Sequence, residues 1–483
     1  MHRINGQSNG LSEKTMENRI PEMTVNQGPL IGDLLASSGI SAKDYSNKGG
    51  YETLKRIVSS NSFDEAIGKL EEARLRGRAG GGYPAAHKWW LTAKSESPQK
   101  IFICNANSGS PGSFKERFLL RSNPHQIVEA VACGAAAIGA ETAYIALPPN
   151  MGFEFDLLEK AVTEAEENNF LGEEIFQSDK SLRVIIYKTL NNYIVGEETA
   201  LLELIEGKPA RPRGKPPLPT AKGLFDQPTV INNLETVLHA HYIFKYGADS
   251  FRRHGTLSSP GTLIFSLSGQ INRPGLFELP LGISLRQLLY DYGGGIKDEQ
   301  EFKAAFVGGI GSAAVTKDRL DIQLDYDSLY DANLSLGSGI VISIGQKVDM
   351  SKVALRAADF LSAGSCGKCL PCKDGTHRTK VMLSHLDKIG EKSIDRIDKV
   401  LPPTLRKRTL NVINPVGGVS YTDTVTGVEK IVHLCEFYKH RGDCHHSYES
   451  ATAIQSLVNN FRSEFESSLL DKTVDRPAEV ILS

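Results

Sequence analysis

The sequence predicts an α/β protein with a parallel sheet, a small mixed α/β module after it and a helical C-terminal region. Three observations carry this prediction. Strand and helix patterns alternate between about residues 100 and 236, as in a parallel sheet with crossover helices. Short β-rich runs occupy about residues 261–344, and from Ser351 the pattern is mostly helical and leads into three closely spaced cysteines.

Composition limits the classes of protein that fit. The chain has 483 residues, of which 40% are hydrophobic and 23% charged, as expected for a globular protein of several domains. The net charge of −2 argues against a nucleic-acid partner, because there is no basic excess to neutralise phosphates. No run of 18 apolar residues occurs, so no direct membrane insertion is expected.

The N-terminal segment and the cysteines predict the compartment. The segment is polar, carries Glu13 and Glu17, and matches neither a secretory signal nor a transit peptide. Seven cysteines, three of them clustered, suit a reducing compartment better than a disulfide framework. We therefore expect a cytoplasmic protein, either free or peripheral to a membrane complex.

The first elements surround a glycine-rich loop. Residues 1–48 are expected to form a partly disordered extension, and a helical pattern follows in which Ser62 is a candidate N-cap. That pattern leads into Arg76–Pro84, which contains four glycines and is followed by Lys88. Such a loop lets backbone N–H groups approach a phosphate, but a glycine-rich surface turn explains the segment equally well.

Polar residues follow the predicted strands. The strand pattern at 100–104 ends in Asn105–Gly112, and ligands of α/β sheets bind outside the carboxyl ends of strands. Further strand patterns cover 143–147 and 182–187, with helix patterns over 125–139 and 156–168. A later strand leads into Asn232 and Asn233, whose amides either contact a polar heterocycle or cap the next helix.

The β-rich module is expected to include a helix near residues 285–290, and the helical region after it carries the cysteine motif. Cys366, Cys369 and Cys372 lie at two-residue intervals, which lets three thiolates cover one face of an iron–sulfur cube that takes its fourth ligand from elsewhere. Zinc sites usually use separated cysteine pairs, so the triplet favours iron–sulfur over zinc or over structural thiols. The sequence therefore predicts electron transfer.

Six motifs carry a family resemblance. RGRAGGGYP, CNANSGSPGSFKER, VGEETALLELIEGK, RGKPPLP, TVINNLET and SCGKCLPCKDGT follow in the order found in the NADH-binding flavoprotein subunit of respiratory complex I. The chain resembles this subunit over about Tyr51–Leu470, and related subunits occur in NAD-reducing hydrogenases and NAD-dependent formate dehydrogenases. The resemblance implies four parts after the extension: a Rossmann-like FMN domain at 49–250 that also binds NAD in the family, a ubiquitin-like β-grasp module at 258–345, a helical [4Fe-4S] domain at 350–470, and a tail at 471–483.

The resemblance also implies site residues by motif position. FMN contacts are expected from Gly77, Gly80, Lys88, Asn105, Asn107, Gly196, Glu197, Asn232 and Asn233. Tyr83 and Lys215 are retained on the dinucleotide side, and Glu198 lies near the expected hydride site. Cys366, Cys369 and Cys372 would bind the cluster with Cys444, which the family's spacing back from Phe461–Glu466 selects over Cys435. Residues 402–429 look like an insertion relative to the family.

Departures from the family pattern concentrate in the dinucleotide half. Asn107, Ser108 and Ser110 stand at acidic positions of the family, Thr189–Tyr193 replaces a GAGAY segment, and Leu91 and Leu218 replace aromatic residues around the adenine.

Two hypotheses follow from these matches and departures. In the first, the chain passes electrons from NADH or NADPH through FMN to the cluster, with a thioredoxin-like [2Fe-2S] subunit and further redox subunits as partners. In the second, FMN and the cluster serve another donor or acceptor. Glu198 supports the first and the lost residues support the second, and family membership favours the first.

Overall fold

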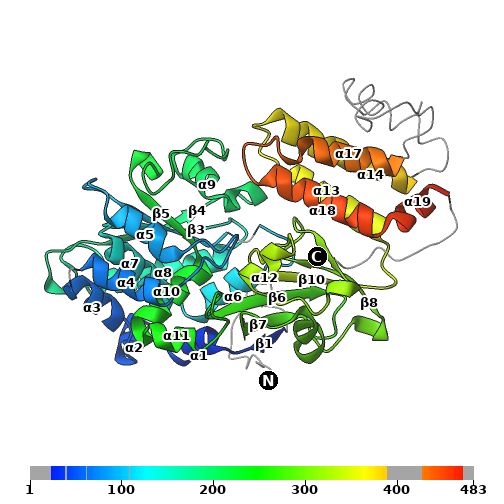
Figure 1. Ribbon diagram of the computed structural model, residues 1–483. Coiled ribbons are helices and arrows are strands. Elements are labelled where there is room, and N and C mark those ends of the chain that lie inside the picture. Colours follow the sequence, from blue (N-terminus) through cyan, green and yellow to red (C-terminus); the bar gives the residue numbers. More distant parts are fainter. Residues whose placement is uncertain (1–22, 39–40, 61, 108, 389–426, 471–483) are drawn as a thin grey trace.

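Two sheets and a helical bundle make up the computed structural model, which describes residues 23–38, 41–60, 62–107, 109–388 and 427–470. Figure 1 shows the first sheet and its helices on one side of the molecule, the second sheet beside them, and the bundle above the second sheet. The predicted α/β fold class with a helical C-terminal region is confirmed.

The first sheet has four parallel strands in the order β4-β3-β2-β5. The strands are β2 (Ile101–Asn105), β3 (Thr142–Leu147), β4 (Arg183–Lys188) and β5 (Thr229–Asn233). All five residues of β2 are buried, because its two faces lie in different cores. Phe102 and Cys104 pack into the core that contains α7 and α10, whereas Ile101 and Ile103 pack against residues of α9. Coverage of both faces explains the uninterrupted apolar run in the sequence.

Helices cover this sheet as the strand–helix alternation predicts. They are α3 (Glu52–Ser60), α4 (Phe63–Glu72), α5 (Ala85–Ala93), α6 (Lys115–Ser122), α7 (Pro124–Ile138), α8 (Gly152–Glu167), α9 (Glu198–Ile205), α10 (Leu234–Tyr246) and α11 (Ala248–Arg252). The predicted cap at Ser62 is confirmed, since its side chain accepts a hydrogen bond from the backbone N–H of Glu65 at 3.3 Å.

The N-terminal part corrects the expected boundary near residue 48. Residues before it form β1 (Thr24–Asn26), α1 (Pro29–Ala36) and α2 (Ala42–Asn47), and β1 pairs in parallel with β7 of the second sheet. Glu278 of β7 accepts hydrogen bonds from the backbone N–H groups of Leu30 (2.9 Å) and Ile31 (2.7 Å) at the start of α1. These elements are too short to give a periodic signal in the sequence. Residues 1–22 lie outside the described part.

The second sheet has six strands in the order β1-β7-β6-β10-β8-β9. The remaining elements of this region are β6 (Thr262–Gly269), β7 (Gly275–Pro280), a wide helical turn at Gln287–Tyr292, β8 (Phe302–Val307), β9 (Ala314–Thr316), α12 (Tyr326–Asp331) and β10 (Ile340–Gly345). The helix expected near 285–290 corresponds to that turn. Successive residues of β8 serve two cores, because Ala305 and Val307 pack with Leu288 while Ala304 and Phe306 pack against the bundle.

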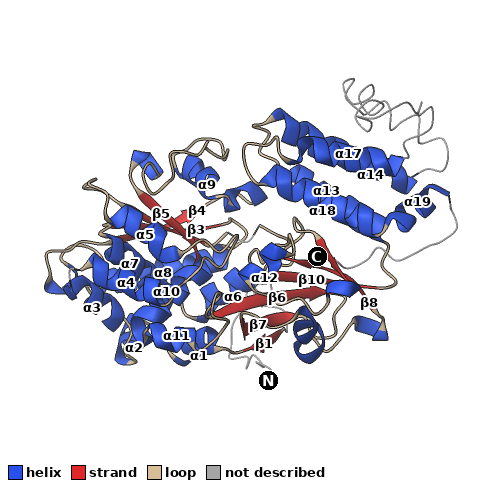
Figure 2. Cartoon of the chain, in the orientation of Figure 1, coloured by secondary structure: helices blue, strands red, loops and turns tan. Residues whose placement is uncertain are grey.

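The bundle consists of α13 (Met350–Ala363), α14 (Leu370–Lys388), α17 (Gly427–Lys439), α18 (His446–Asn460) and α19 (Arg462–Leu470). Figure 2 shows these helices stacked over the strands of the second sheet. Of the insertion expected at 402–429, only 427–429 lies within the described residues. Among the described helices, none combines the length and apolarity that a membrane crossing requires.

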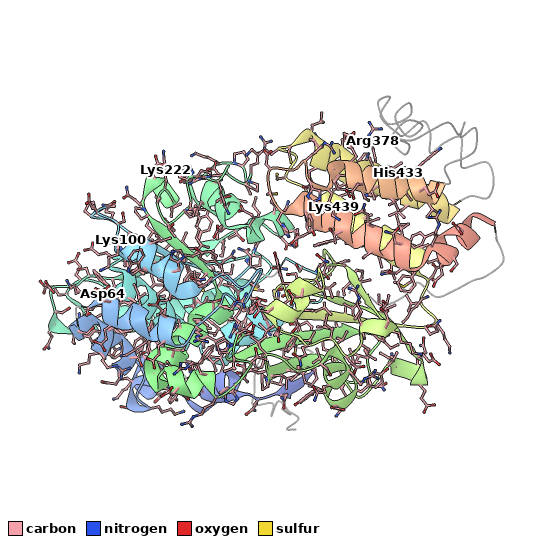
Figure 3. The ribbon with its side chains drawn as sticks, viewed as in Figure 1. Asp64, Lys100, Lys222, Arg378, His433 and Lys439 are labelled. Atoms are coloured by element: carbon pink, nitrogen blue, oxygen red, sulfur yellow. The ribbon has the colours of Figure 1, made fainter. Side chains whose placement is uncertain are left out.

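Two cationic side chains of the bundle have partners on the bundle itself. Figure 3 labels Arg378 of α14 and Lys439 of α17. Arg378 pairs with Asp374 at 2.6 Å, and the Lys439 ammonium donates to Gln455 at 3.2 Å.

Candidate functional site

A cavity of about 660 Å³ lies where the two sheets and the bundle meet. This volume falls within the range of about 300–1,000 Å³ that is usual for small-molecule and cofactor sites. The cavity brings together every flavin and dinucleotide residue expected from the sequence: Gly77, Gly80, Tyr83, Lys88, Asn105, Asn107, Gly196, Glu197, Glu198, Lys215, Asn232 and Asn233. Cys444 of the bundle lines the same cavity.

The glycine-rich loop between α4 and α5 forms one wall. Gly80 has a φ of +147° and its N–H donates to the Gly337 carbonyl at 3.0 Å, which ties the loop to the second sheet. A Cβ at Gly82 would lie 2.5 Å from the ring of Tyr326, whereas a Cβ at Gly80 or Gly81 would meet nothing within 4 Å. The open side of the loop thus gives a ligand close access to backbone, as phosphate binding requires.

Arg78 of this loop is not a surface cation. Its side chain is fully buried and donates to the Pro260 carbonyl at 2.8 Å, and its backbone N–H donates to the hydroxyl of Thr236 at 2.8 Å. The cavity is also lined by Lys88, Lys215 and Arg213, and Arg213 is paired with Glu203 and Glu206.

Two lysines hold one carboxylate at the cavity. The Lys88 ammonium lies 2.9 Å from Glu198 Oε2 and donates to the Ile231 carbonyl at 3.1 Å, while the Lys215 ammonium lies 2.8 Å from Glu198 Oε1 and 3.1 Å from Glu197 Oε1. Burial opposes ionisation of Glu198, but the two lysines outweigh it and lower the pKa of this carboxyl. Among the described residues Lys88 uses two of its three N–H donors, so one is available to an anionic ligand.

Asn105, the last residue of β2, lies close to Asn107, which follows the strand. The Asn105 side-chain oxygen accepts from the backbone N–H and the side-chain amide of Asn107 at 3.0 and 2.9 Å, and its own amide donates to the Gly196 carbonyl at 3.4 Å. The oxygen of Asn107 accepts from Thr189 at 2.6 Å. These bonds fix the two amides at the carboxyl edge of the sheet.

Asn232 and Asn233 at the end of β5 have different partners. The oxygen of Asn232 accepts from the Trp89 indole at 2.8 Å, which leaves the amide N–H groups as the part available to a ligand. The oxygen of Asn233 caps α10 by accepting from the Glu235 backbone N–H at 3.0 Å. Of the two alternatives weighed for this pair, the helix cap is found at Asn233, and a contact of Asn232 with a heterocycle stays a prediction.

Five cysteines lie in or near the bundle. Four of them are the predicted cluster ligands, and the fifth, Cys435, lies apart in the bundle core. Burial raises the pKa of Cys372 to about 12, and repulsion from Cys369, Cys444 and Cys366 adds to this. Cys435 lies instead in the bundle core, with Thr379 at 3.9 Å and Tyr438 at 3.7 Å from its sulfur. The donor set around Cys372 matches the four thiolates that an iron–sulfur cube needs.

Glu116, Tyr193 and Glu449 are among the cavity residues that were not predicted as site residues. Glu116 accepts from the Asn233 amide at 3.2 Å, and the Tyr193 hydroxyl donates to Glu449 at 3.1 Å. Glu116 and Tyr193 lie within or beside the six motifs, which could have drawn attention to them. Glu449 carries no such signal, because its contact with Tyr193 joins residues 256 positions apart.

Only some of the residues that depart from the family pattern lie at the cavity. Ser110 lines the cavity, whereas Leu91 and Leu218 are not among the described lining residues, and Leu218 is exposed. Ser108 lies outside the described residues.

Comparison with known proteins gives consistent matches. The Nuo51 FMN-binding domain model matches residues 70–242, and the model of the NADH-ubiquinone oxidoreductase-F iron–sulfur binding region matches residues 352–410. The F 2 subunit of NADH-quinone oxidoreductase of Rhizobium meliloti is 40% identical over 343 residues, covering 71% of this chain and 82% of that protein. The HndC subunit of the NADP-reducing hydrogenase of Solidesulfovibrio fructosivorans is 37% identical over 348 residues, covering 72% and 71%.

Other relatives match a larger part of the chain. The F subunit of NADH-quinone oxidoreductase of Escherichia coli is 30% identical over 428 residues, covering 88% of this chain and 89% of that protein. A crystal structure of NAD+-reducing [NiFe]-hydrogenase in the H2-reduced state superposes with a TM-score of 0.75 at 24% identity, over 96% of this chain and 72% of that chain, which supports the fold. The chain therefore belongs to the family of NADH-quinone oxidoreductase F subunits, oxidoreductase flavoproteins with an FMN-binding domain and a [4Fe-4S]-binding region.

Proposed function

We propose that this chain is the electron-input subunit of a larger redox complex, which oxidises NADH or NADPH at FMN and passes the electrons to a [4Fe-4S] cluster held by Cys366, Cys369, Cys372 and Cys444. One observation carries the proposal. The cavity lined by the glycine loop and the strand-end asparagines is also lined by Cys444. A flavin in this cavity would therefore lie beside a cluster ligand.

The chemistry of the cofactor fits this arrangement. When bound, FMN accepts two electrons from a nicotinamide and releases them singly, as an iron–sulfur acceptor requires. The residues of this chain would bind FMN and the dinucleotide and orient them. The glycine loop and the remaining N–H donor of Lys88 would hold the phosphate, and the Asn232 amide would donate to the ring. Glu198, kept ionised by two lysines, accepts hydrogen bonds from amide or hydroxyl groups of the dinucleotide.

The dinucleotide preference is expected to differ from that of a strictly NADH-dependent enzyme. Ser110 offers the cavity a hydroxyl in place of a carboxylate, so it does not repel the 2′-phosphate of NADPH. Relatives that are subunits of NADH-quinone oxidoreductase and of an NADP-reducing hydrogenase support assembly with other redox subunits. A thioredoxin-like [2Fe-2S] protein is the neighbour we expect to take the electrons.

Ferricyanide reduction by the purified, FMN- and iron-replete chain tests the proposal. We expect turnover with NADH and with NADPH. The variant Glu198→Gln should lower kcat/KM about tenfold or more, since hydrogen bonds to charged groups contribute about 1.5–3 kcal/mol. The matched control is Glu301→Gln, which changes an exposed acid remote from the cavity. No turnover with either nucleotide would reject the proposal and favour the alternative, in which FMN and the cluster serve a different donor.

A further inference from the structure

Glu129, Cys133 and His241 form a buried group of metal-binding side chains outside the flavin cavity. Glu129 and Cys133 are one turn apart on α7, and His241 lies on the neighbouring helix α10. One carboxylate oxygen, the thiol sulfur and one ring nitrogen all lie within 4.8 Å of one another. Each of the three residues is at most 1% exposed. None of them lines the cavity described above.

His241 points to a missing ligand. Neither of its ring nitrogens has a hydrogen-bond partner among the described residues, although the residue is buried. Its Nε2 lies 3.4 Å from Glu129 Oε2, outside hydrogen-bond geometry. Buried polar groups normally have hydrogen-bond partners, because a group without one loses its hydration free energy and gains no bond in return. The His241 imidazole faces a carboxylate and lies beside a thiol, and these three groups together resemble the ligands of a metal site.

The surrounding charge also favours a cation. Glu129 is buried and accepts from the Tyr45 hydroxyl at 2.5 Å and from the Leu54 backbone N–H at 3.3 Å, and Arg56 is the cation that acts electrostatically on Cys133. A carboxylate and a thiolate together neutralise a divalent cation, so the occupied site would carry no net charge into the core. The Tyr45 hydroxyl contacts the same carboxylate oxygen that faces His241.

We propose that Glu129, Cys133 and His241 bind a structural Zn²⁺ that joins α7 to α10. Thiolate, imidazole and carboxylate are the ligands that zinc takes, at about 2.0–2.3 Å, whereas calcium and magnesium take oxygen alone. Separations within 4.8 Å need only small side-chain shifts to reach that geometry. Binding replaces the thiol proton of Cys133 and releases it to solvent, with His241 neutral and Glu129 ionised, and no electron is transferred.

The position of the site indicates its role. Helix α10 begins directly after Asn233 at the cavity, and α7 packs under β2, which ends in Asn105. An ion that holds these two helices together supports the cavity floor without touching the flavin. Its loss should therefore lower thermal stability before it changes the electron chemistry.

Elemental analysis of the full-length protein tests this inference. Protein grown with added zinc and purified anaerobically without a metal-affinity step should contain about one zinc per chain in addition to the cluster iron. Cys133→Ser and His241→Gln should each reduce this to less than about a tenth while keeping iron and FMN. The matched control Cys435→Ser removes another buried thiol and should keep the zinc.

X-ray absorption at the zinc edge of the unmodified protein separates this site from zinc trapped in the cluster motif, and it needs no variant to fold. One sulfur with nitrogen and oxygen neighbours supports the proposal. A shell of four sulfurs, or zinc that disappears in Cys369→Ser, overturns it. Absence of zinc from protein with full iron and FMN also overturns it, and so does another metal on the same ligands.

Discussion

Replacing Lys115 by methionine should destabilise the protein strongly, because this lysine is a buried cation that joins the two sheets. Its side chain is fully buried, and the ammonium lies 2.6 Å from Glu235 Oε2 and donates to the Ser338 carbonyl at 2.8 Å and the Arg78 carbonyl at 3.3 Å. The other oxygen of Glu235 accepts from the Ile264 backbone N–H at 2.8 Å. Removing the lysine leaves this carboxylate buried without its ammonium partner.

Two estimates of the cost agree. Burial opposes ionisation of Glu235, but Lys115 and His239 outweigh it and lower the pKa to about 2. A drop of about two units from the ordinary value of about 4.3 corresponds to roughly 3 kcal/mol of stability at neutral pH. Breaking one side of a buried ion pair costs about 3–5 kcal/mol. Because the pKa is lowered, this stabilisation is complete above pH 5 and is lost only as the pH falls from about 4 toward 2.

Thermal unfolding of Lys115→Met should therefore show a Tm about 6–20 °C lower, at about 2–4 °C per kcal/mol, and by the same amount at pH 6 and pH 8. The double variant Lys115→Met, Glu235→Gln should recover part of this loss because no unpaired charge remains. Lys317→Met removes an exposed ion pair with Glu301 and should leave the Tm unchanged. A Tm shift below about 2 °C for Lys115→Met, or no recovery in the double variant, would refute the reasoning.

Three further changes address the cofactor sites. Cys444→Ser should lose the cluster iron after anaerobic reconstitution whereas Cys435→Ser keeps it, and iron counts with the opposite pattern would contradict the assignment. Lys88→Ala should weaken FMN binding about tenfold or more by removing a charge-assisted hydrogen bond, measured by flavin fluorescence titration, and an unchanged Kd would argue against a phosphate contact. Ser110→Glu should raise the preference for NADH over NADPH, because a carboxylate in the cavity would repel the 2′-phosphate, and unchanged steady-state constants for the two nucleotides would contradict this.

Much of the flavin half could be predicted from the sequence. The apolar run of β2 ends abruptly in Asn105, and this polarity change marks both the strand end and the edge where ligands bind. Motif spacing also allowed Cys444 to be chosen over Cys435 as the predicted fourth ligand, because the Phe461–Glu466 motif follows directly after the helix that begins just beyond Cys444. These signals are local, and each depends on residues close together in the chain.

The parts that were not predicted depend on contacts over long sequence distances. Strand β1 has three residues with one buried side chain, too few for an alternating pattern, and it becomes a strand because β7 offers a free edge. The ion pair of Lys115 with Glu235 lies in two separate helices, and nothing in either segment marks it as buried. The buried group of Glu129 and His241 was missed for the same reason.

The shared core between the bundle and the second sheet has a consequence for how electrons leave the protein. Phe306, Ile342 and Ile344 pack with Met350 and Leu457, so swinging the bundle away would expose all of these side chains to water. Burial of each of these side chains stabilises the packed state by about 1.5–3 kcal/mol, and the sum makes such a motion too rare to occur in every catalytic cycle. A cluster held by cysteines of the bundle would therefore keep a fixed distance from a flavin in the cavity, and we expect the next electron carrier to dock against the bundle rather than wait for the bundle to move.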